Sequence, residues 1–385
     1  MAKQQKIKRY TQKQRTFKAG PRPLGIVITA ILLIGLVGIG MAMYNPIMEF
    51  AEQILNPPVV GEPEIIAELP PPPSSSEESS QPLPPPQPET PEEIRAILMP
   101  LETAKYQSLW DAFVIEMPEN TNTVMVELKS SEGIVNASST KTAAAEWEAV
   151  AENPINLEML ADYLETKGYS FAVRIAAFAD PYAARALRAN GAIMHGSGLT
   201  WMDNTPERGG RQWLNPYAAA AREYIVDLAV EAAEAGAAFV LLDRVQFPSD
   251  PTGTATYGET GGVTKHEILK AFTAEIKTAL EPYGTRVAIY LSAGTLERPE
   301  PAGNTIYYGG SPIEFGADEM VLGMNLDFVH GATIEEKLQG AMRAKELADN
   351  FDVKIIPVIT AREDAPHSKQ IEIIEALGFA EYILY

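Results

Sequence analysis

Asp243 follows an uninterrupted run of apolar residues, Ala238–Leu242, which the chain enters through Gly236. Such a run is typical of a strand buried on both faces of a parallel sheet. Pro248 lacks the N–H that a sheet ladder needs and marks the end of the strand. Asp243 thus stands at the end of the strand, where α/β folds place their chemistry. The alternative is that Asp243 only caps the following loop or pairs with Arg244.

Other charged, amide and aromatic side chains stand near the ends of predicted strands. Two facing carboxylates can hydrolyse a glycosidic bond, because one stabilises the oxocarbenium-like centre while the other protonates the leaving oxygen. Plainer alternatives stay open: Glu127 and Lys129 would form a buried pair, and Trp201 and Trp213 would only pack a long loop. The strand-end candidates are Glu102, Glu127, Lys129, Glu132, Arg174, Asp243, Arg244, Gln246, Tyr290, Ser292, Asn325, Asp327, Arg362, Glu363, Asp364, Tyr382 and Tyr385.

Apolar runs alternate with helical patterns from Glu92 onward, which favours an α/β fold with a parallel sheet. We predict strands at Ile94–Met99, Thr123–Leu128, Ser170–Ala177, Phe239–Asp243, Arg286–Ser292, Glu319–Asp327, Lys354–Thr360 and Ala380–Tyr385. Predicted helices include Leu157–Lys167, Tyr217–Ala235, His266–Pro282, Ile334–Asn350 and Ser368–Leu377. Eight such units in about 290 residues match a (β/α)8 TIM barrel. An open doubly wound sheet is the alternative, but the first strand–helix turn has no glycine for a nucleotide.

Two segments, NPYAAAAREYIVDLAVEAAEAG (215–236) and LLDRVQFP (241–248), resemble the bacterial family of putative glycosyl hydrolase domains, which are (β/α)8 barrels. The resemblance extends through VMVELKSSEGIV (124–135), VRIAAFADP (173–181) and LTWMDN (199–204), and covers about Glu92 to Tyr385. The matching positions are Asn215–Tyr217, Gly236, Asp243, Val245, Phe247, Pro248, Glu127, Lys129, Glu132, Arg174, Phe178, Asp180, Pro181, Trp201 and Asp203.

The resemblance implies glycoside hydrolysis with Asp243 as nucleophile or charge stabiliser. Alpha-galactosidase-like barrels, which the chain resembles distantly, pair a fourth-strand Asp with a sixth-strand Asp. This likeness makes Asp327 the first choice as proton donor, with Glu127 as the reserve. The predicted substrate-binding side chains are Lys129, Arg174, Trp201, Arg244 and Asn325.

The chain also departs from the family pattern. Arg244 replaces a family Tyr, Gln246 replaces a family Arg, and the fifth strand, VAIYLS (287–292), lacks the family's Asp. Two functions therefore stay open. One is hydrolysis of a cell-wall or extracellular glycan, and the other is a degenerate barrel that binds glycan or scaffolds envelope proteins without turnover.

The first 91 residues differ from the rest in composition. Residues 1–23 carry eight Lys or Arg and no acid, and residues 24–44 contain no charge. These 21 apolar residues span about 31 Å as a helix, enough to cross a bilayer. We predict a signal anchor with a cytoplasmic basic head and an extracytoplasmic C-terminal domain at the plasma membrane. Residues 45–91 form a Pro-rich linker, and residues 92–385 the barrel.

Composition limits the cofactors and partners. The chain has no cysteine, and His195, His266, His330 and His367 stand too far apart for ligand spacing, so we predict no metal and no cofactor. Residues 24–385 hold 23 basic and 51 acidic residues, a balance of −28, which disfavours nucleic acid. The predicted partners are a glycan and the membrane.

Overall fold

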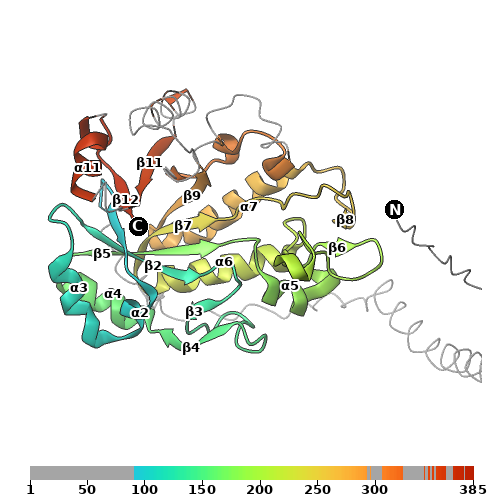
Figure 1. Ribbon diagram of the computed structural model, residues 1–385, viewed down its shortest axis with the longest axis horizontal. Helices are drawn as coiled ribbons and strands as arrows, with labels where there is room; N and C mark the ends of the chain where they lie inside the picture. Colours follow the sequence, from blue (N-terminus) through green and yellow to red (C-terminus); the bar gives the residue numbers. More distant parts are fainter. Residues whose placement is uncertain are drawn as a thin grey trace, which may run out of the picture. The chain divides into compact units, whose positions relative to one another are not determined.

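The computed structural model describes residues 91–292, 295, 306–323, 342, 346, 349–350, 353–360, 367–376 and 378–385. Within these residues, eight parallel strands close into a barrel wrapped by helices (Figure 1). The barrel strands are β1 (Arg95–Leu98), β2 (Thr123–Lys129), β5 (Ser170–Ala176), β7 (Ala237–Asp243), β9 (Arg286–Ser292), β10 (Glu319–Gly323), β11 (Lys354–Ile359) and β12 (Tyr382–Leu384). The predicted TIM barrel is confirmed, and the open sheet is excluded.

Closure depends on β1, which pairs in parallel with both β2 and β12. Its residue Ala96 lies opposite Thr123 on one side and Ile383 on the other. All eight predicted strands are present with ends within a few residues. The C-terminal end of the sixth strand cannot be compared with its prediction, because the structure describes this strand only to Gly323 and residues 324–327 lie outside the described residues.

Four short strands were not predicted. β3 (Val135–Ala137) and β4 (Val150–Ile155) extend the sheet beyond β2, and β6 (Met194–His195) pairs with β8 (Ala255–Thr256). Their sequences carry no apolar run, because β4 reads VAENPI and β6 and β8 have two residues each. β3 and β4 add to an edge that the barrel already provides, whereas β6 and β8 pair with each other in a separate two-stranded sheet.

The described helices are α2 (Leu101–Lys105), α3 (Trp110–Glu116), α4 (Leu157–Thr166), α5 (Pro181–Leu187), α6 (Ala219–Glu234), α7 (Lys265–Leu280) and α11 (His367–Ala376). Side-chain caps start three of them. Asn156 accepts from the Met159 N–H at α4, Asp180 caps α5, and Thr264 forms a capping box with Glu267 at α7. Gly236, with φ of +95°, ends the α6 segment as the sequence predicts. Most of the predicted helix 334–350 lies outside the described residues.

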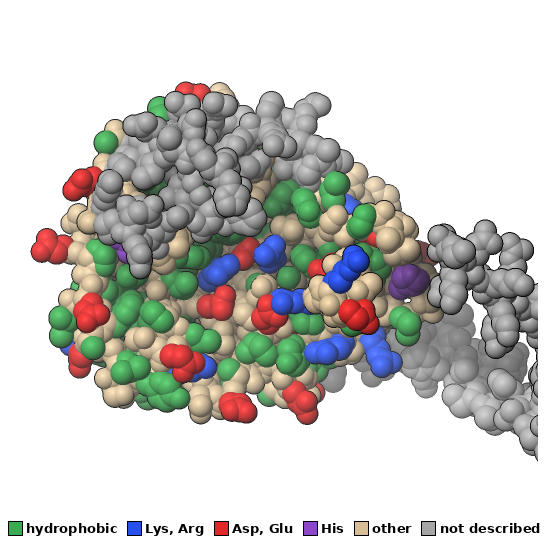
Figure 2. All heavy atoms as spheres, in the orientation of Figure 1, with side chains coloured by type: hydrophobic (Ala, Val, Ile, Leu, Met, Phe, Trp, Pro, Cys, Tyr) green, Lys and Arg blue, Asp and Glu red, His purple; other side chains and the backbone are tan. Residues whose placement is uncertain are grey.

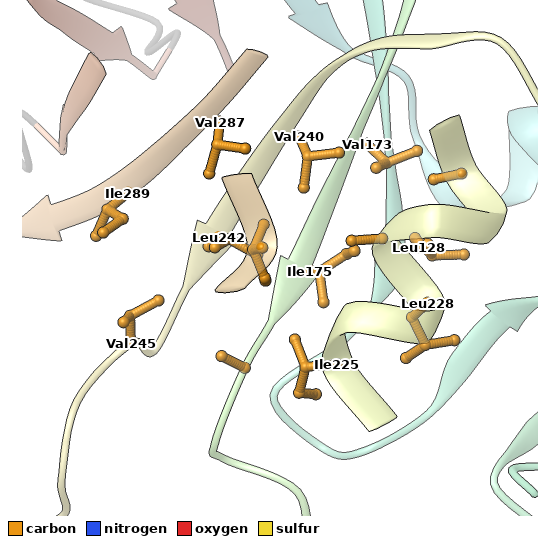
Figure 3. Close-up of a cluster of buried hydrophobic side chains, with 14 of the residues drawn as sticks. Leu128, Val173, Ile175, Ile225, Leu228, Val240, Leu242, Val245, Val287 and Ile289 are labelled. Carbon is orange, nitrogen blue, oxygen red and sulfur yellow. The ribbon is translucent and has the colours of Figure 1, made fainter. Parts of the chain in front are cut away.

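Two apolar layers fill the space on either side of the barrel wall. Outside, Ile225 and Leu228 of α6 pack against Ile175, Val240 and Leu242 of β5 and β7 (Figure 3). Inside, the lumen is filled by a second cluster, so it is a core and not a pore. That inner cluster includes Ile94, Ala96, Met125, Ala172, Phe239, Leu241, Ala288, Val321, Ile356, Val358 and Ile383.

A network of charges closes the N-terminal end of the barrel. Arg286 pairs with Glu319, and Lys354 Nζ lies 2.7 Å from Glu381 Oε2. The other oxygen of Glu381, Oε1, accepts a hydrogen bond of 2.8 Å from the N–H of Ile94. Glu319 and Glu381 are nearly fully buried. Buried charges are stable only when paired, so this network stabilises the strand arrangement at that end.

None of the helices in the described ranges is long and apolar enough to cross a membrane. The predicted anchor, residues 24–44, lies outside those ranges, as do the basic head and all of the linker except residue 91. The anchor and the linker boundaries stay predictions.

We expect Glu381→Ala to lower the free energy of unfolding by about 2–4 kcal/mol, because it leaves the buried Ile94 N–H without an acceptor and removes the partner of Lys354. Urea unfolding of the purified protein measures this loss. Glu102→Ala, which removes a largely exposed partner of Lys105, is the matched control and should cost less than about 1 kcal/mol. Equal stability of the two variants would contradict a stabilising role for the network.

Candidate active site

Three charged side chains meet at the C-terminal end of the barrel, one from each of three neighbouring strands. Arg174 of β5 lies between Glu127 of β2 and Asp243 of β7. Its Nη1 is 3.3 Å from Glu127 Oε1, and its Nη2 is 2.5 Å from Asp243 Oδ2. Side chains on adjacent parallel strands lie within reach of one guanidinium, so the sequence-predicted residues Glu127, Arg174 and Asp243 form one cluster. Figure 2 shows acidic and basic side chains intermingled near the middle of the visible face.

Aromatic rings hold Arg174 in place. Its guanidinium carbon is 5.9 Å from the ring centre of Tyr290 and 5.6 Å from that of Tyr385. Contacts of this kind are favourable when the cation is partly desolvated. Burial alone would lower the pKa of Arg174, but Tyr385, Asp243 and Glu127 together hold that pKa above its usual value. Arg174 is therefore a fixed positive charge in the centre of the site.

Asp243 is buried, with 5% of its surface exposed, and both of its oxygens are bound. Oδ2 meets Arg174, and Oδ1 accepts a hydrogen bond of 2.7 Å from the backbone N–H of Arg244. The ion-pair partner of Asp243 is thus Arg174, and not Arg244 as the sequence alone suggested. Arg244 contributes its backbone, while its side chain is exposed.

The backbone of Arg244 has a φ of +56°, a conformation that a non-glycine residue adopts only at a cost. This turn directs the N–H of Arg244 back to Asp243 directly after the strand ends. Strain of this kind persists where the surroundings over-determine it, and it gathers at functional sites. The strained turn and the buried carboxylate together mark the end of β7 as the centre of the site.

Three tyrosines line the site beside Asp243. Burial raises the pKa values of Tyr290 and Tyr385 and raises that of Tyr308 to about 12, with the Asp243 charge adding to each. The Tyr308 hydroxyl donates to Gln246 Oε1 at 3.3 Å. Tyr290 and Tyr385 are protonated at neutral pH and can donate hydrogen bonds to a ligand, whereas the Tyr308 proton is already donated to Gln246. Sequence reasoning named Tyr290 and Tyr385 as strand-end residues but did not select them, and it missed Tyr308, which follows no strand.

Lys129 does not join the cluster. It is fully buried, its Nζ lies 3.0 Å from Asp180 Oδ2, and it donates to the carbonyl oxygen of Ala176 at 2.6 Å. The register shifts between Glu127 and Lys129, so that Glu127 lies opposite Arg174 while Lys129 lies opposite Ile175. Glu127 follows the regular alternation of β2 into the barrel mouth, and the β-bulge after it turns Lys129 into the wall. Lys129 therefore forms a buried ion pair, as the plainer alternative held, but its partner is Asp180 and not Glu127. Burial lowers the pKa of Lys129.

The two tryptophans pack the long connection before α6. Trp201, predicted to bind substrate, is 3% exposed and donates from Nε1 to Thr254 Oγ1 at 3.1 Å. Trp213 is also buried and donates to Asp203 Oδ2 at 2.9 Å. Neither ring face is open to a sugar in this structure. The plainer interpretation, in which both rings pack the loop, describes their positions.

Asn325 and Asp327 fall outside the described residues, so the pairing of Asp327 with Asp243 stays a prediction. Glu132 pairs with Arg211 across the loop surface. In the described ranges, no three histidine or acidic side chains gather as metal ligands would.

Residues 96–306 match the model of a protein family described as "Putative glycosyl hydrolase domain". The match covers more than half of the chain. The chain belongs to this family. It matches no curated protein.

Three solved structures are similar to this chain at low sequence identity. The glycoside hydrolase domain of PgaB (BpsB) from Bordetella bronchiseptica is 15% identical, with a TM-score of 0.54, covering 76% of this chain and 93% of that one. A hypothetical protein from Ruminiclostridium thermocellum ATCC 27405 is 23% identical with a TM-score of 0.44, covering 50% and 96%. An alpha-galactosidase from Thermus thermophilus is 11% identical with a TM-score of 0.46, covering 77% and 59%. The Bordetella domain supports the barrel fold.

We expect Lys129→Met to lower the free energy of unfolding by about 3–5 kcal/mol, because it leaves Asp180 buried and unpaired. The double variant, Lys129→Met with Asp180→Asn, should regain most of that loss. It leaves no unpaired charge at this position, and an asparagine at position 180 can still cap α5. Urea unfolding of the single and double variants measures the coupling. Additive losses in the double variant would show that the two side chains do not act as a pair.

Proposed function

We propose that this protein hydrolyses a cell-wall or extracellular glycan at the C-terminal end of its barrel, with Asp243 as nucleophile or charge stabiliser. The observation that carries the proposal is the position of Asp243: a buried carboxylate at the end of β7, bound by Arg174 and by a strained backbone turn. Membership of the glycosyl hydrolase domain family supports the reaction class. Barrels of this kind carry their chemistry at that end.

The geometry gives each neighbour a part in this chemistry. Arg174 and the Arg244 N–H fix the two Asp243 oxygens, which orients the carboxylate toward the barrel mouth. A pre-oriented negative charge stabilises an oxocarbenium-like centre without reorganising during the reaction. The tyrosines supply hydrogen-bond donors and apolar ring surface, as a sugar site requires. The proton donor in this proposal is Asp327, with Glu127 as the reserve.

A specific observation favours a second function, glycan binding without turnover. One guanidinium contacts both Glu127 and Asp243, so the two carboxylates are tied to the same positive charge. A proton donor must hold a proton and release it, and a carboxylate in an ion pair is poorly suited to that task. In this alternative Arg174, the tyrosines and Asp243 form a polar sugar-binding site on a barrel that has lost its acid.

Hydrolysis predicts a distinct response to Asp243→Asn. We expect turnover to fall about 10²–10⁴-fold while sugar binding and the thermal midpoint stay close to those of the wild type. The assay uses full-length protein in detergent with a panel of p-nitrophenyl glycosides and a glycan array. Asp111→Asn, which changes an exposed acid on the outer helix α3, is the control and should retain full turnover.

The same assay separates the acid candidates and the two functions. Asp327→Asn should remove most turnover, and Glu127→Gln should do so only if the reserve assignment holds. Binding on the array without release of nitrophenol in the wild type would decide for the second function. Full activity of Asp243→Asn would reject the proposed role of Asp243.

We also propose that the barrel lies outside the cell, anchored by residues 24–44 and spaced by residues 45–91. The charge step at residue 23 and the 21-residue uncharged run support this topology. Protease added to intact cells should remove the barrel and leave the basic head protected. A barrel that becomes accessible only after lysis would reject the topology.

A further inference from the structure

Tyr385 has a polar group that finds no partner in the part of the chain that the structure describes. Its backbone is bound on both sides, because its N–H donates to the Ile359 carbonyl at 2.7 Å and its carbonyl accepts from His367 Nε2 at 3.1 Å. Its side chain packs on the cluster inside the barrel. The hydroxyl is buried there and makes no hydrogen bond to any described residue.

The position of this hydroxyl is fixed by its neighbours. The Arg174 guanidinium lies over the Tyr385 ring, and Tyr290 packs against the same inner cluster. Because the same guanidinium contacts Glu127 and Asp243, this contact places the Tyr385 ring at the cluster in the barrel mouth. Burial raises its pKa, so the group carries its proton at neutral pH and is a hydrogen-bond donor.

A buried donor without an acceptor is unfavourable, and native proteins rarely tolerate one. The Tyr385 hydroxyl is such a donor, and it lies beside ionised side chains at the barrel mouth, where an oxygen of a bound ligand can accept its hydrogen bond. Tyr382, the first residue of β12, also has a buried hydroxyl without a partner among the described residues, but its ring faces the outer layer between strands and helices. The two hydroxyls are both buried, and the two rings differ in which side of the wall they face.

We propose that Tyr385 is a further ligand-contacting residue, whose hydroxyl donates a hydrogen bond to a hydroxyl oxygen of the bound sugar and selects sugars that carry an acceptor there. The inference rests on the proposed function, because it needs a sugar in the barrel mouth. It adds a specificity-determining residue that is independent of whether turnover occurs.

Tyr385→Phe tests the inference, with Tyr382→Phe as the matched control. Full-length wild-type and variant proteins are compared by thermal unfolding and by binding of D-glucose, D-galactose, N-acetyl-D-glucosamine and their p-nitrophenyl glycosides. Both variants should unfold at the wild-type midpoint or above it, because each removes an unsatisfied buried hydroxyl. Tyr385→Phe should weaken binding of the best probe about fivefold to tenfold, and Tyr382→Phe should leave it unchanged.

Deoxy analogues of the best probe then identify the acceptor. For one of them, wild type and Tyr385→Phe should bind equally, because the hydrogen bond is already lost from the sugar side. A lower midpoint for Tyr385→Phe, or unchanged binding, would overturn the inference while leaving the proposed function intact. The inference would also be overturned if wild type bound every deoxy analogue more tightly than Tyr385→Phe does. A wild type that binds none of the probes would overturn the proposed function, and this inference with it.

Discussion

The contact between Arg174 and its two carboxylates is the constraint around which the barrel mouth is built. The guanidinium has rings at 5.6 and 5.9 Å and acids on either side, so its position determines where Glu127, Asp243, Tyr290 and Tyr385 can lie. Arginine suits this role because its planar fork meets two acceptors at once and stacks on aromatic faces. A lysine would supply the charge without the geometry.

That contact depends in turn on the register of three strands. The regular register of β2 sets Glu127 opposite Arg174, and the β-bulge that follows turns Lys129 into the wall, where it meets Asp180. Asn136 donates to the Glu127 carbonyl at 2.9 Å and helps to hold the irregular stretch. The bulge thus lets one strand supply an acid to the site and a base to the core. The position of Tyr290 also requires glycine at position 323, because a Cβ atom there would lie 1.9 Å from the Tyr290 hydroxyl oxygen.

The barrel could be predicted from sequence because eight buried parallel strands each need a continuous apolar run, and such runs are visible without a structure. Asp243 could be predicted for the same reason, since it ends the clearest of them. Its partner could not, because Arg174 lies 69 residues away and Arg244 is adjacent in the chain. The side of the wall that Lys129 faces depends on a single extra residue, and an unbroken alternation predicts the opposite side. The orientations of Trp201 and Trp213 depend on loop contacts that leave no periodic pattern.

The chain enters the barrel at the end opposite to the site. Arg286 Nη1 donates to the Pro91 carbonyl at 3.0 Å, and Lys354 Nζ lies 3.4 Å from the Glu92 carbonyl oxygen. The charged network at the N-terminal ends of the strands therefore also binds the segment that leads into the barrel. A pulling force transmitted along the preceding segment would be borne first by these two hydrogen bonds to backbone carbonyls and by the closing strand β1. The barrel mouth lies at the far end of the strands from these contacts. A load on the incoming chain would thus act at one end of the eight strands, and the candidate active site lies at the other.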